Sequence, residues 1–329
     1  MAKAIRIHEI GGPEVLSLDE VAVDKPGPGQ ALIRHTAIGV NFTDLHHRTG
    51  RYPIPGLPVT LGMEAAGVVE AVGTGVGTAS VGDRVCYSAG GHGAAPCTYA
   101  DYAVRPAETL IRLPDEIDDV TAAGMTLKGL TAQYLVRSAY PVDADETVLV
   151  HAAAGGVGLL LCQWANYLGA RVIGVVSNEE KAELAAANGC HHVIISGRED
   201  IADRARALTG GEGVAAVFDS VGKDTYQASL ESLQVRGMLV SYGSASGPIP
   251  PFNLFNLNTM GSLYATSAGL AWYTRSRPEL LERAGELVDL VCRGVLSVPV
   301  NQKYALKDAA EAHRALESRI TTGATVLLP

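Results

Sequence analysis

TVLVHAAAGGVG, residues Thr147–Gly158, is the segment from which the rest of the chain is interpreted. An apolar, partly β-branched run ends in small residues and then in Gly155, Gly156 and Gly158, and a second apolar run follows directly. This order predicts a strand, a tight turn and the start of a helix. Glycines there let the backbone approach a ligand closely, and the helix N-terminus offers N–H groups to a pyrophosphate. The segment therefore predicts a dinucleotide-binding turn.

Strands and helices alternate from this turn onward. Strands are predicted at Thr147–Ala152, Arg171–Val176, His192–Ile195, Val214–Asp219, Met238–Ser241 and Ser262–Thr266. Helices are predicted at Gly156–Leu168, Glu179–Asn188, Asp200–Leu208 and Thr225–Leu233. Such alternation implies right-handed βαβ crossovers and a parallel sheet covered on both faces. The fold class is therefore α/β, with a doubly wound Rossmann sheet.

The segment before the alternation has mostly a period of two from Ala4 to about Arg105, with Gly and Pro turns, which indicates a β-rich domain. Its segment Asn41–Pro58 begins with helix-capping residues and ends in a Pro-rich loop, where a site is expected. Val120–Tyr140 is predicted to be helical. The helices and closing strand after Thr266 fit neither the alternation nor a third core, so we expect them to fold back onto the β-rich domain.

Composition excludes several classes of protein. A chain of 329 residues favours two domains, and 47 % hydrophobic with 19 % charged residues is globular. The net charge of −9 argues against a nucleic-acid partner. Five cysteines at irregular spacings form neither a disulfide framework nor a C-x-x-C metal pair. Lys3, Arg6, His8 and Glu9 interrupt the apolar residues of MAKAIRIHEI, so we expect no secretion signal there. His151 and the glycines interrupt the most apolar window, which argues against a membrane span, so we expect a cytoplasmic protein.

The end of the second strand indicates which dinucleotide is bound. An acidic residue there would bond the ribose of NAD and repel a 2′-phosphate. This chain instead has the neutral Ser177 and Asn178, with Lys181 in the following helix, which favours NADP. Glu179 and Glu180 complicate this preference, although acidic residues also suit a first helical turn. The alternative for Lys181 is an ordinary solvated lysine.

Several motifs together resemble one family over essentially the whole chain. They are NF-x-D with R-x-G-x-YP (Asn41–Pro53), LGMEAAGVVEAVG (Leu61–Gly73), GDRV (Gly82–Val85), LKGLTA (Leu127–Ala132), HAAAGGVG (His151–Gly158), FDSVG (Phe218–Gly222) and AHRALESR-x-x-x-G (Ala312–Gly323). The chain resembles the zinc-independent, zeta-crystallin-like quinone oxidoreductase branch of the medium-chain dehydrogenase/reductase superfamily.

The resemblance implies a fold, a reaction and a partner. A GroES-like β-rich catalytic domain would comprise residues 1–125 and 267–329, and a Rossmann NADPH-binding domain residues 126–266. The implied reaction is reduction of a quinone by NADPH. The implied partner is a second copy of the chain, joined through the Rossmann sheets at Ser262–Thr266.

Two positions argue against a metal ion. Where zinc alcohol dehydrogenases of this superfamily have a zinc cysteine, this chain has Asn41, and where they have Gly-His-Glu it has Gly62-Met63-Glu64. His46 and His47 beside Asp44, with His92, are the residues that could substitute as ligands. Adjacent histidines on a short helix point apart, so we expect no metal site.

The resemblance also implies the cofactor contacts. The phosphate turn is Ala154, Gly155, Gly156 and Val157; the 2′-phosphate pocket is Ser177, Asn178 and Lys181; and Ser220, Tyr242, Gly243, Thr266 and Ser267 occupy further contact positions. Arg319 matches an arginine that reaches the 2′-phosphate; without the motif it would be a surface arginine. Ser196-Gly197 departs from the family, which often has a tyrosine there, and this puts the strength of the NADP preference in doubt.

The predicted chemistry is hydride transfer without a metal. Asn41 and Tyr52 are expected at the substrate carbonyl and Thr131 on the nicotinamide side, with the proton coming from water. Tyr52 has the alternative of a wall residue, and Asp44 that of a helix cap or structural partner. Rival functions are reduction of α,β-unsaturated carbonyls by NADPH, and a non-catalytic crystallin-like or RNA-binding role.

Overall fold

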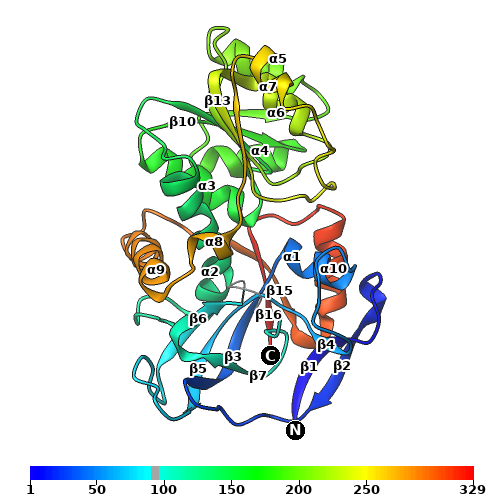
Figure 1. The fold of residues 1–329 in the computed structure, drawn as a ribbon, viewed down its shortest axis with the longest axis vertical. Helices are drawn as coiled ribbons and strands as arrows, with labels where there is room; N and C mark the ends of the chain where they lie inside the picture. Colours follow the sequence, from blue (N-terminus) through cyan, green and yellow to red (C-terminus); the bar gives the residue numbers. More distant parts are fainter. Residues whose placement is uncertain (90–95) are drawn as a thin grey trace. The chain divides into compact units, whose positions relative to one another are not determined.

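The computed structural model describes residues 1–89 and 96–329 and contains a six-stranded parallel sheet (Figure 1). Its strands are β9 (Thr147–His151), β10 (Arg171–Val176), β11 (His192–Ile195), β12 (Val214–Asp219), β13 (Leu233–Ser241) and β14 (Tyr264–Ser267). They are arranged in the order β11-β10-β9-β12-β13-β14, all parallel. Numbered from β9, this is the order 3-2-1-4-5-6 of doubly wound dinucleotide folds. The predicted Rossmann sheet is confirmed.

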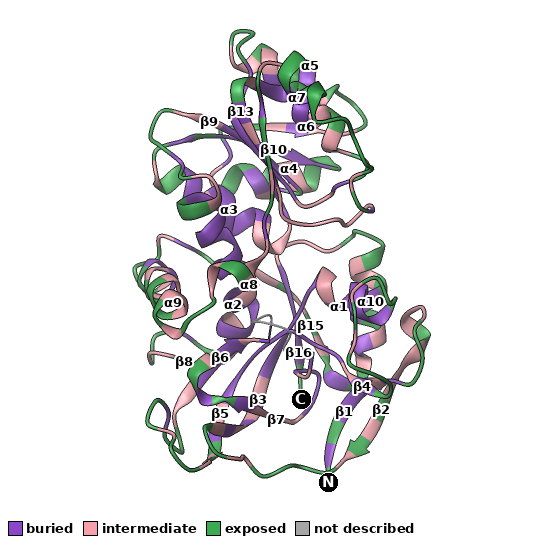
Figure 2. Cartoon of the chain, in the orientation of Figure 1, coloured by how far each residue is buried: buried purple, intermediate pink, exposed green. Residues whose placement is uncertain are grey.

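The helices between these strands also agree with the prediction. They are α3 (Gly156–Tyr167), α4 (Glu179–Ala187), α5 (Ile201–Leu208) and α6 (Tyr226–Ser232), followed later by α7 (Phe255–Thr259). Every residue of β12 is buried, and so are five of the six in β10, because helices cover both faces of a parallel sheet (Figure 2). In α3 the run from Gly158 to Cys162, with Trp164 and Ala165, forms the buried side.

Strand β13 begins at Leu233 rather than at the predicted Met238. Val214 of β12 pairs with Leu233, and Ala216 pairs with Met238, so the register shifts between the two pairs. Arg236 has a φ of 61° within the extra residues. This irregularity breaks the alternation of apolar residues, which is why the pattern indicated only the second half of the strand.

Segments from both ends of the chain form the other large sheet. Its order is β15-β16-β3-β5-β6-β8, and β7 also pairs with β3. The strands are β3 (Gln30–Val40), β5 (Glu64–Val72), β6 (Arg84–Ser88), β7 (Tyr102–Pro106), β8 (Ile111–Arg112), β15 (Val300–Ala305) and β16 (Ala324–Leu328). Since β16 pairs antiparallel with β3, the C-terminal segment completes the sheet of the N-terminal segment.

Smaller elements surround this second sheet. β1 (Ala2–Ile7), β2 (Leu16–Val21) and β4 (Val59–Thr60) form a three-stranded sheet in the order β2-β1-β4. The helices are α1 (Phe42–Arg48), α2 (Asp119–Tyr134), which continues into a π-helical turn at Leu135–Ala139, α8 (Leu270–Tyr273), α9 (Arg277–Cys292) and α10 (Ala309–Glu317). The apolar core includes residues of β1, β3, β5 and α10.

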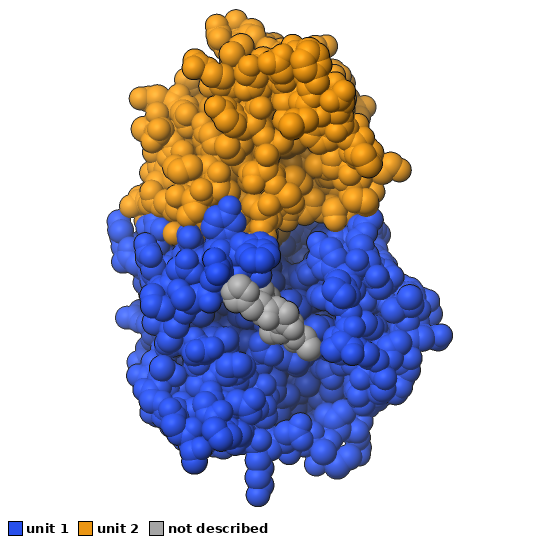
Figure 3. All heavy atoms as spheres, in the orientation of Figure 1, with its two compact units in different colours: residues 1–130, 270–294, 298–329 blue, residues 131–269, 295–297 orange. Residues whose placement is uncertain are grey.

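The chain divides into two compact units, coloured separately in Figure 3. The first unit comprises residues 1–130, 270–294 and 298–329, and the second comprises residues 131–269 and 295–297. None of the helices in the described part of the chain is long and apolar enough to cross a membrane.

Candidate functional site

The predicted cofactor residues of the second unit follow the carboxyl ends of its parallel strands. Five strands contribute, and each places its residues at or just after its last position. They are Ala154 and Gly155 in the turn after β9, with Gly156 and Val157 at the start of α3; Ser177 and Asn178 after β10, with Lys181 in the first turn of α4; Ser220 after β12; Tyr242 and Gly243 after β13; and Thr266 and Ser267 at the end of β14. Because all these ends lie at one edge of a parallel sheet, the fold brings the set together there.

The glycine turn brings the start of α3 very close to the end of β9. A Cβ atom at Gly158 would lie 2.2 Å from the carbonyl oxygen of Ala152, so no side chain fits at this position. Ala152 itself has a φ of 52°, which is unusual for a residue other than glycine. The Ala153 N–H donates to Val175 O at 3.1 Å and ties the turn to β10. The turn thus directs the first N–H groups of α3 toward the carboxyl edge of the sheet.

The residues after β10 are exposed and partly engaged in capping. Asn178 Oδ1 accepts a hydrogen bond from the Lys181 N–H at 2.9 Å, so Asn178 is the N-cap of α4. Glu179 forms an ion pair with Arg198. One of the two acidic residues that complicate the NADP prediction, Glu179, therefore has a cationic partner of its own.

The loops after β12 and β13 are held against each other. The Tyr242 N–H donates to Asp219 O at 2.9 Å, and the Ala245 N–H donates to Ser220 O at 3.1 Å. A Cβ atom at Gly243 would lie 2.7 Å from Ser220 O, which explains the glycine. Burial raises the pKa of the Tyr242 hydroxyl well above its ordinary value. Ser220, Tyr242 and Gly243 therefore form one rigid corner of the edge.

A buried polar network at this edge has no counterpart in the sequence analysis. The Ser229 hydroxyl donates to Asp219 Oδ2 at 2.8 Å and lies 2.9 Å from His151 Nε2. Asp219 Oδ1 accepts from the Val221 N–H at 2.7 Å. Burial lowers the pKa of the His151 imidazole, and the nearby Asp219 opposes this shift. The network joins the ends of β9 and β12 to α6; FDSVG marks Asp219, but nothing in the sequence pairs it with Ser229 and His151.

In the first unit, Asn41 and Asp44 form a capping box at the start of α1. The Asn41 N–H donates to Asp44 Oδ2 at 2.8 Å, and the Tyr99 hydroxyl donates to the same oxygen at 3.0 Å. Asp44 is completely buried, and this burial raises its pKa to about 7. The alternative role of Asp44 as a helix cap is therefore confirmed.

The Asp44 contacts continue into a chain of buried groups. Tyr99 Oη lies 3.0 Å from His313 Nε2, and the Arg48 guanidinium donates to His313 Nδ1 at 3.0 Å. Since arginine only donates, His313 carries its proton on Nε2. Burial and Arg48 lower the pKa of His313 to about 3. Arg48 also forms an ion pair with Glu317, so the network joins α1 to α10.

The Asn41 side chain contacts a buried ion pair. Its Nδ2 donates to Glu64 Oε1 at 3.0 Å, and Glu64 also pairs with the Lys128 ammonium. The Leu127 N–H donates to Glu64 Oε2 at 2.6 Å. Glu64 and Lys128 each lie in a motif of the sequence. The two residues are 64 positions apart, so the sequence alone does not indicate their contact.

Tyr52 packs against both histidines that were considered as metal ligands. Its ring centroid lies 4.8 Å from that of His46 and 5.7 Å from that of His47. Burial lowers the pKa of His46 to about 4. His92 lies outside the described residues, and within them no cluster of three His, Cys, Asp or Glu side chains is placed to hold a metal.

Arg319 and Thr131 complete the predicted set. Arg319 is exposed, directly after α10 in the first unit, with a φ of 57°. Thr131 is buried in α2 and belongs to the second unit.

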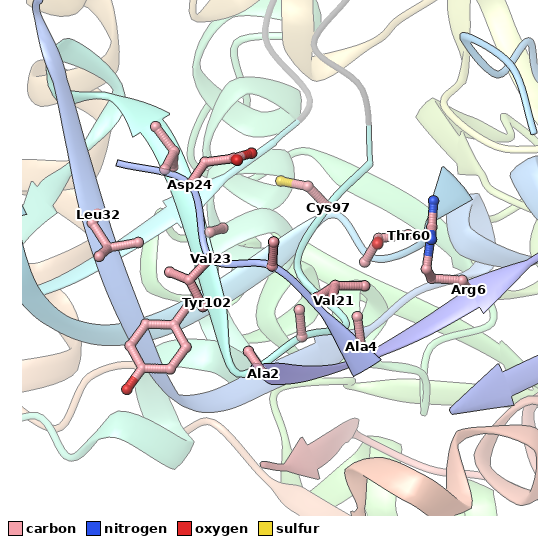
Figure 4. A pocket seen from close by; sticks show the side chains of 14 residues that line it. Ala2, Ala4, Arg6, Val21, Val23, Asp24, Leu32, Thr60, Cys97 and Tyr102 are labelled. Carbon is pink, nitrogen blue, oxygen red and sulfur yellow. The ribbon is translucent and has the colours of Figure 1, made fainter. Parts of the chain in front are cut away.

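Two hollows within the units lie away from the predicted residues. One, of about 390 Å³, lies beside β1, β2 and β7 of the first unit and is lined by residues such as Ala4, Val21 and Tyr102 (Figure 4). The other, of about 480 Å³, lies at the amino ends of the parallel strands, beside Glu146 and Arg171. None of the predicted site residues lines either hollow.

Comparison with known proteins gives the same assignment along the whole chain. Residues 27–142 match the family model described as alcohol dehydrogenase GroES-like domain, and residues 156–286 match zinc-binding dehydrogenase. A quinone oxidoreductase of Pseudomonas aeruginosa is 48 % identical, with 100 % of both chains covered. A 2-haloacrylate reductase of Burkholderia sp is 46 % identical, over 100 % of this chain and 99 % of the relative. A crystal structure of Escherichia coli quinone oxidoreductase complexed with NADPH superimposes with a TM-score of 0.96 at 45 % identity, with 100 % of both chains covered.

The raised pKa of Asp44 predicts a loss of stability as the pH rises. The folded carboxyl keeps its proton up to about pH 7, whereas the unfolded one, with a pKa of 3.8, loses it far earlier. Its stabilising contribution is therefore complete below about pH 4 and declines until about pH 7, by at most about 1.4 kcal/mol per pH unit. Asp44→Asn does not titrate. The stability of this variant relative to wild type, measured by urea unfolding, should rise between about pH 5 and pH 7 and then stay level.

Asp118→Asn is the matched control for this measurement. Asp118 also caps a helix, accepting from the Val120 and Thr121 N–H groups, but its pKa is lowered from 3.8, so its effect should be constant over the same interval. A difference between Asp44→Asn and wild type that does not change with pH would show that Asp44 is ionised throughout.

Proposed function

The chain belongs to the quinone oxidoreductase family of medium-chain dehydrogenases/reductases, and from this we propose that it transfers hydride from NADPH to a quinone without a metal ion. The observation that carries the cofactor assignment is the edge of the parallel sheet. There the glycine turn, the neutral Ser177 and Asn178, and Lys181 follow neighbouring strands. The Escherichia coli relative, described as complexed with NADPH, supports the same assignment.

The donor set around Glu64 does not fit a zinc ion. Both carboxylate oxygens already accept hydrogen bonds, from Asn41 Nδ2 and from the Leu127 N–H, and the Lys128 ammonium lies against the same group. An amide nitrogen is not a zinc ligand, and a fixed ammonium repels a cation. The proposed mechanism therefore contains no metal, although one matching family model carries zinc in its description.

The proposed mechanism depends on orientation and hydrogen bonding. NADPH, when bound, supplies the hydride. Reduction of a quinone gives a stabilised hydroquinone anion, so less electrophilic assistance is required than for a simple ketone. Asn41 and Tyr52 donate to the quinone oxygen, and Thr131 lies on the nicotinamide side. The glycine turn, from Ala154 to Val157, holds the pyrophosphate at the start of α3.

The remaining cofactor assignments are proposals of the same kind. Ser177, Lys181 and Arg319 bind the 2′-phosphate, and the corner of Ser220, Tyr242 and Gly243 with Thr266 and Ser267 contacts the rest of the cofactor. Residues 1–125 and 267–329 form the catalytic domain, and residues 126–266 form the cofactor domain. The five cysteines are all free, which supports a cytoplasmic location.

A second candidate activity is reduction of α,β-unsaturated acids or carbonyls. The relative named 2-haloacrylate reductase favours it, because its named substrate is a conjugated alkene and its sequence is nearly as similar as those of the quinone oxidoreductases. Hydride addition to a conjugated alkene also gives a delocalised anion. The net charge of −9 disfavours the RNA-binding alternative.

A comparison of acceptors tests the proposed activity. NADPH oxidation should be rapid with benzoquinone or naphthoquinone and slower with 2-chloroacrylate or a simple enone. The measurement is the loss of NADPH absorbance under initial-rate conditions for each acceptor. A higher kcat/KM with 2-chloroacrylate than with any quinone would favour the second activity, and no oxidation with any acceptor would defeat both.

Lys181→Ala should separate the two nicotinamide cofactors. Removing one charge-assisted contact to the 2′-phosphate should raise the KM for NADPH about tenfold and leave the KM for NADH nearly unchanged. Glu183→Ala is the control, since Glu183 is exposed on the same helix α4. Equal changes in both KM values would show that Lys181 is an ordinary surface lysine.

We also propose a homodimer joined through the edge of the Rossmann sheet. Strand β14 is the terminal strand of that sheet, and large apolar side chains are exposed on it, on β13, on α7 and at the N-cap of α7. Their exposed fractions are 68 % for Val235, 75 % for Leu254, 64 % for Phe255 and 55 % for Tyr264. Exposed sheet edges and apolar patches of this kind favour pairing with another chain.

Light scattering after size exclusion tests the dimer. The wild type should have twice the chain mass of 34.3 kDa, and the double variant Leu254→Glu with Tyr264→Lys should be a monomer. Val81→Glu, at an apolar residue of the first unit that is 63 % exposed, should not change the mass. A double variant that remains dimeric would place the interface elsewhere.

A further inference from the structure

We infer that Glu64 and Lys128 are positioning residues that set the orientation of the Asn41 amide. The inference rests on the proposed role of Asn41 as a donor to the substrate oxygen. Glu64 and Lys128 orient the amide so that its NH₂ group is available as the donor. Neither residue has a role in the chemistry that the sequence predicts.

Glu64 lies at the start of β5 and has no exposed surface. Its Oε1 accepts from Asn41 Nδ2 at 3.0 Å, and its Oε2 accepts from the Leu127 N–H at 2.6 Å. The Lys128 side chain is 6 % exposed and forms an ion pair with Oε1. Three donors therefore hold the carboxylate in one place: one at the N-cap of α1 and two in α2.

The backbone is shaped to admit this carboxylate. Gly39 of β3 is the cross-strand partner of Glu64. A Cβ atom at Gly39 would lie 2.3 Å from Glu64 Oε1 and 2.3 Å from Ala123 O. Any residue other than glycine would displace either the carboxylate or helix α2. The position of Glu64 is thus determined by β3, β5 and α2 together.

The chemical consequence concerns which end of the Asn41 amide faces the carboxylate. A carboxylate only accepts hydrogen bonds, so it attracts the NH₂ group and repels the amide oxygen. A flipped amide would place two oxygens against each other in a buried site, which is strongly unfavourable. Glu64 therefore fixes the rotamer, and the second hydrogen of Nδ2 is the one that can be donated to a quinone oxygen.

Lys128 has a separate task. A buried carboxylate without a counter-charge is destabilising, and Lys128 supplies that charge from α2. The main chain of Asn41 is held independently, because its N–H donates to Asp44. In the capping box the Asn41 side chain also accepts from the Asp44 N–H, so Asp44 and the Glu64–Lys128 pair hold opposite ends of the amide in the same orientation.

A double-mutant cycle tests this inference. The variants are Glu64→Gln, Asn41→Ala and the two combined, assayed with NADPH and the best quinone. A glutamine at position 64 accepts either end of the amide, so only the capping contact with Asp44 still favours one orientation, and we expect a loss in kcat/KM of about tenfold. In the Asn41→Ala background the same change should have less than about a twofold effect. The Kd for NADPH, from fluorescence titration, should not change.

Asp119→Asn is the matched control for loss of an ion pair. Asp119 belongs to the same unit and forms an ion pair with Arg84 at 2.6 Å; this pair includes neither Asn41 nor Glu64. It should leave kcat/KM within about twofold of wild type. Lys128→Arg, which keeps the charge, should retain most of the activity, whereas Lys128→Met should not. If Glu64→Gln does not fold, the neutral pair Glu64→Gln with Lys128→Met replaces it in the cycle.

The outcomes separate this inference from the proposed function. Glu64→Gln could lower kcat/KM equally in the wild-type and Asn41→Ala backgrounds, or it could leave kcat/KM unchanged. Either result would overturn the positioning role and leave the proposed function of the wild type intact. A wild type that oxidises NADPH with no quinone would defeat the proposed function and this inference with it. A loss confined to the background that contains Asn41 would establish that Glu64 acts through Asn41.

Discussion

The first turn of α3 lies so close to the end of β9 that residue 158 has no space for a side chain, and the Rossmann unit depends on this approach. It lets the helix start directly at the strand end, with its unpaired N–H groups at the carboxyl edge of the sheet. The strands on either side then place their own carboxyl ends, and the residues after them, at the same edge. A bulkier residue at this position would separate α3 from β9 and displace the phosphate-binding turn.

Buried carboxylates have a comparable part in the rest of the molecule. Asp219 contacts Ser229, which contacts His151; Asp44 accepts from Asn41 and Tyr99; and Glu64 accepts from Asn41 and Leu127. Burying such groups is unfavourable unless donors surround them. Each carboxylate therefore fixes the relative positions of the elements that supply its donors. In all three cases these elements carry residues of the proposed site, so the polar cores are also its scaffold.

The absence of a metal from the proposed mechanism follows from this arrangement of donors. A carboxylate that is already bonded to an amide and an ammonium acts on the substrate only indirectly, through the group it orients. Hydride addition to a quinone or to a conjugated acid gives a delocalised anion. Hydrogen bonds from the protein are therefore sufficient electrophilic assistance for either acceptor. The similarity to both a quinone oxidoreductase and a 2-haloacrylate reductase is consistent with one donor arrangement serving related acceptors.

Local patterns in the sequence determined the α/β class, the six parallel strands, the glycine turn and the residues expected at the carboxyl edge. Strand and helix periodicity and the spacing after each strand are short-range properties, so they can be read directly. The tertiary structure decided the rest. The bulge that extends β13 to Leu233, the pairing of β16 with β3, and the contacts of Glu64 with Lys128 and of Asp219 with Ser229 were not evident from spacing. These features depend on the packing of segments far apart in the chain, where the partner of a buried charge is set by three-dimensional proximity rather than by sequence separation.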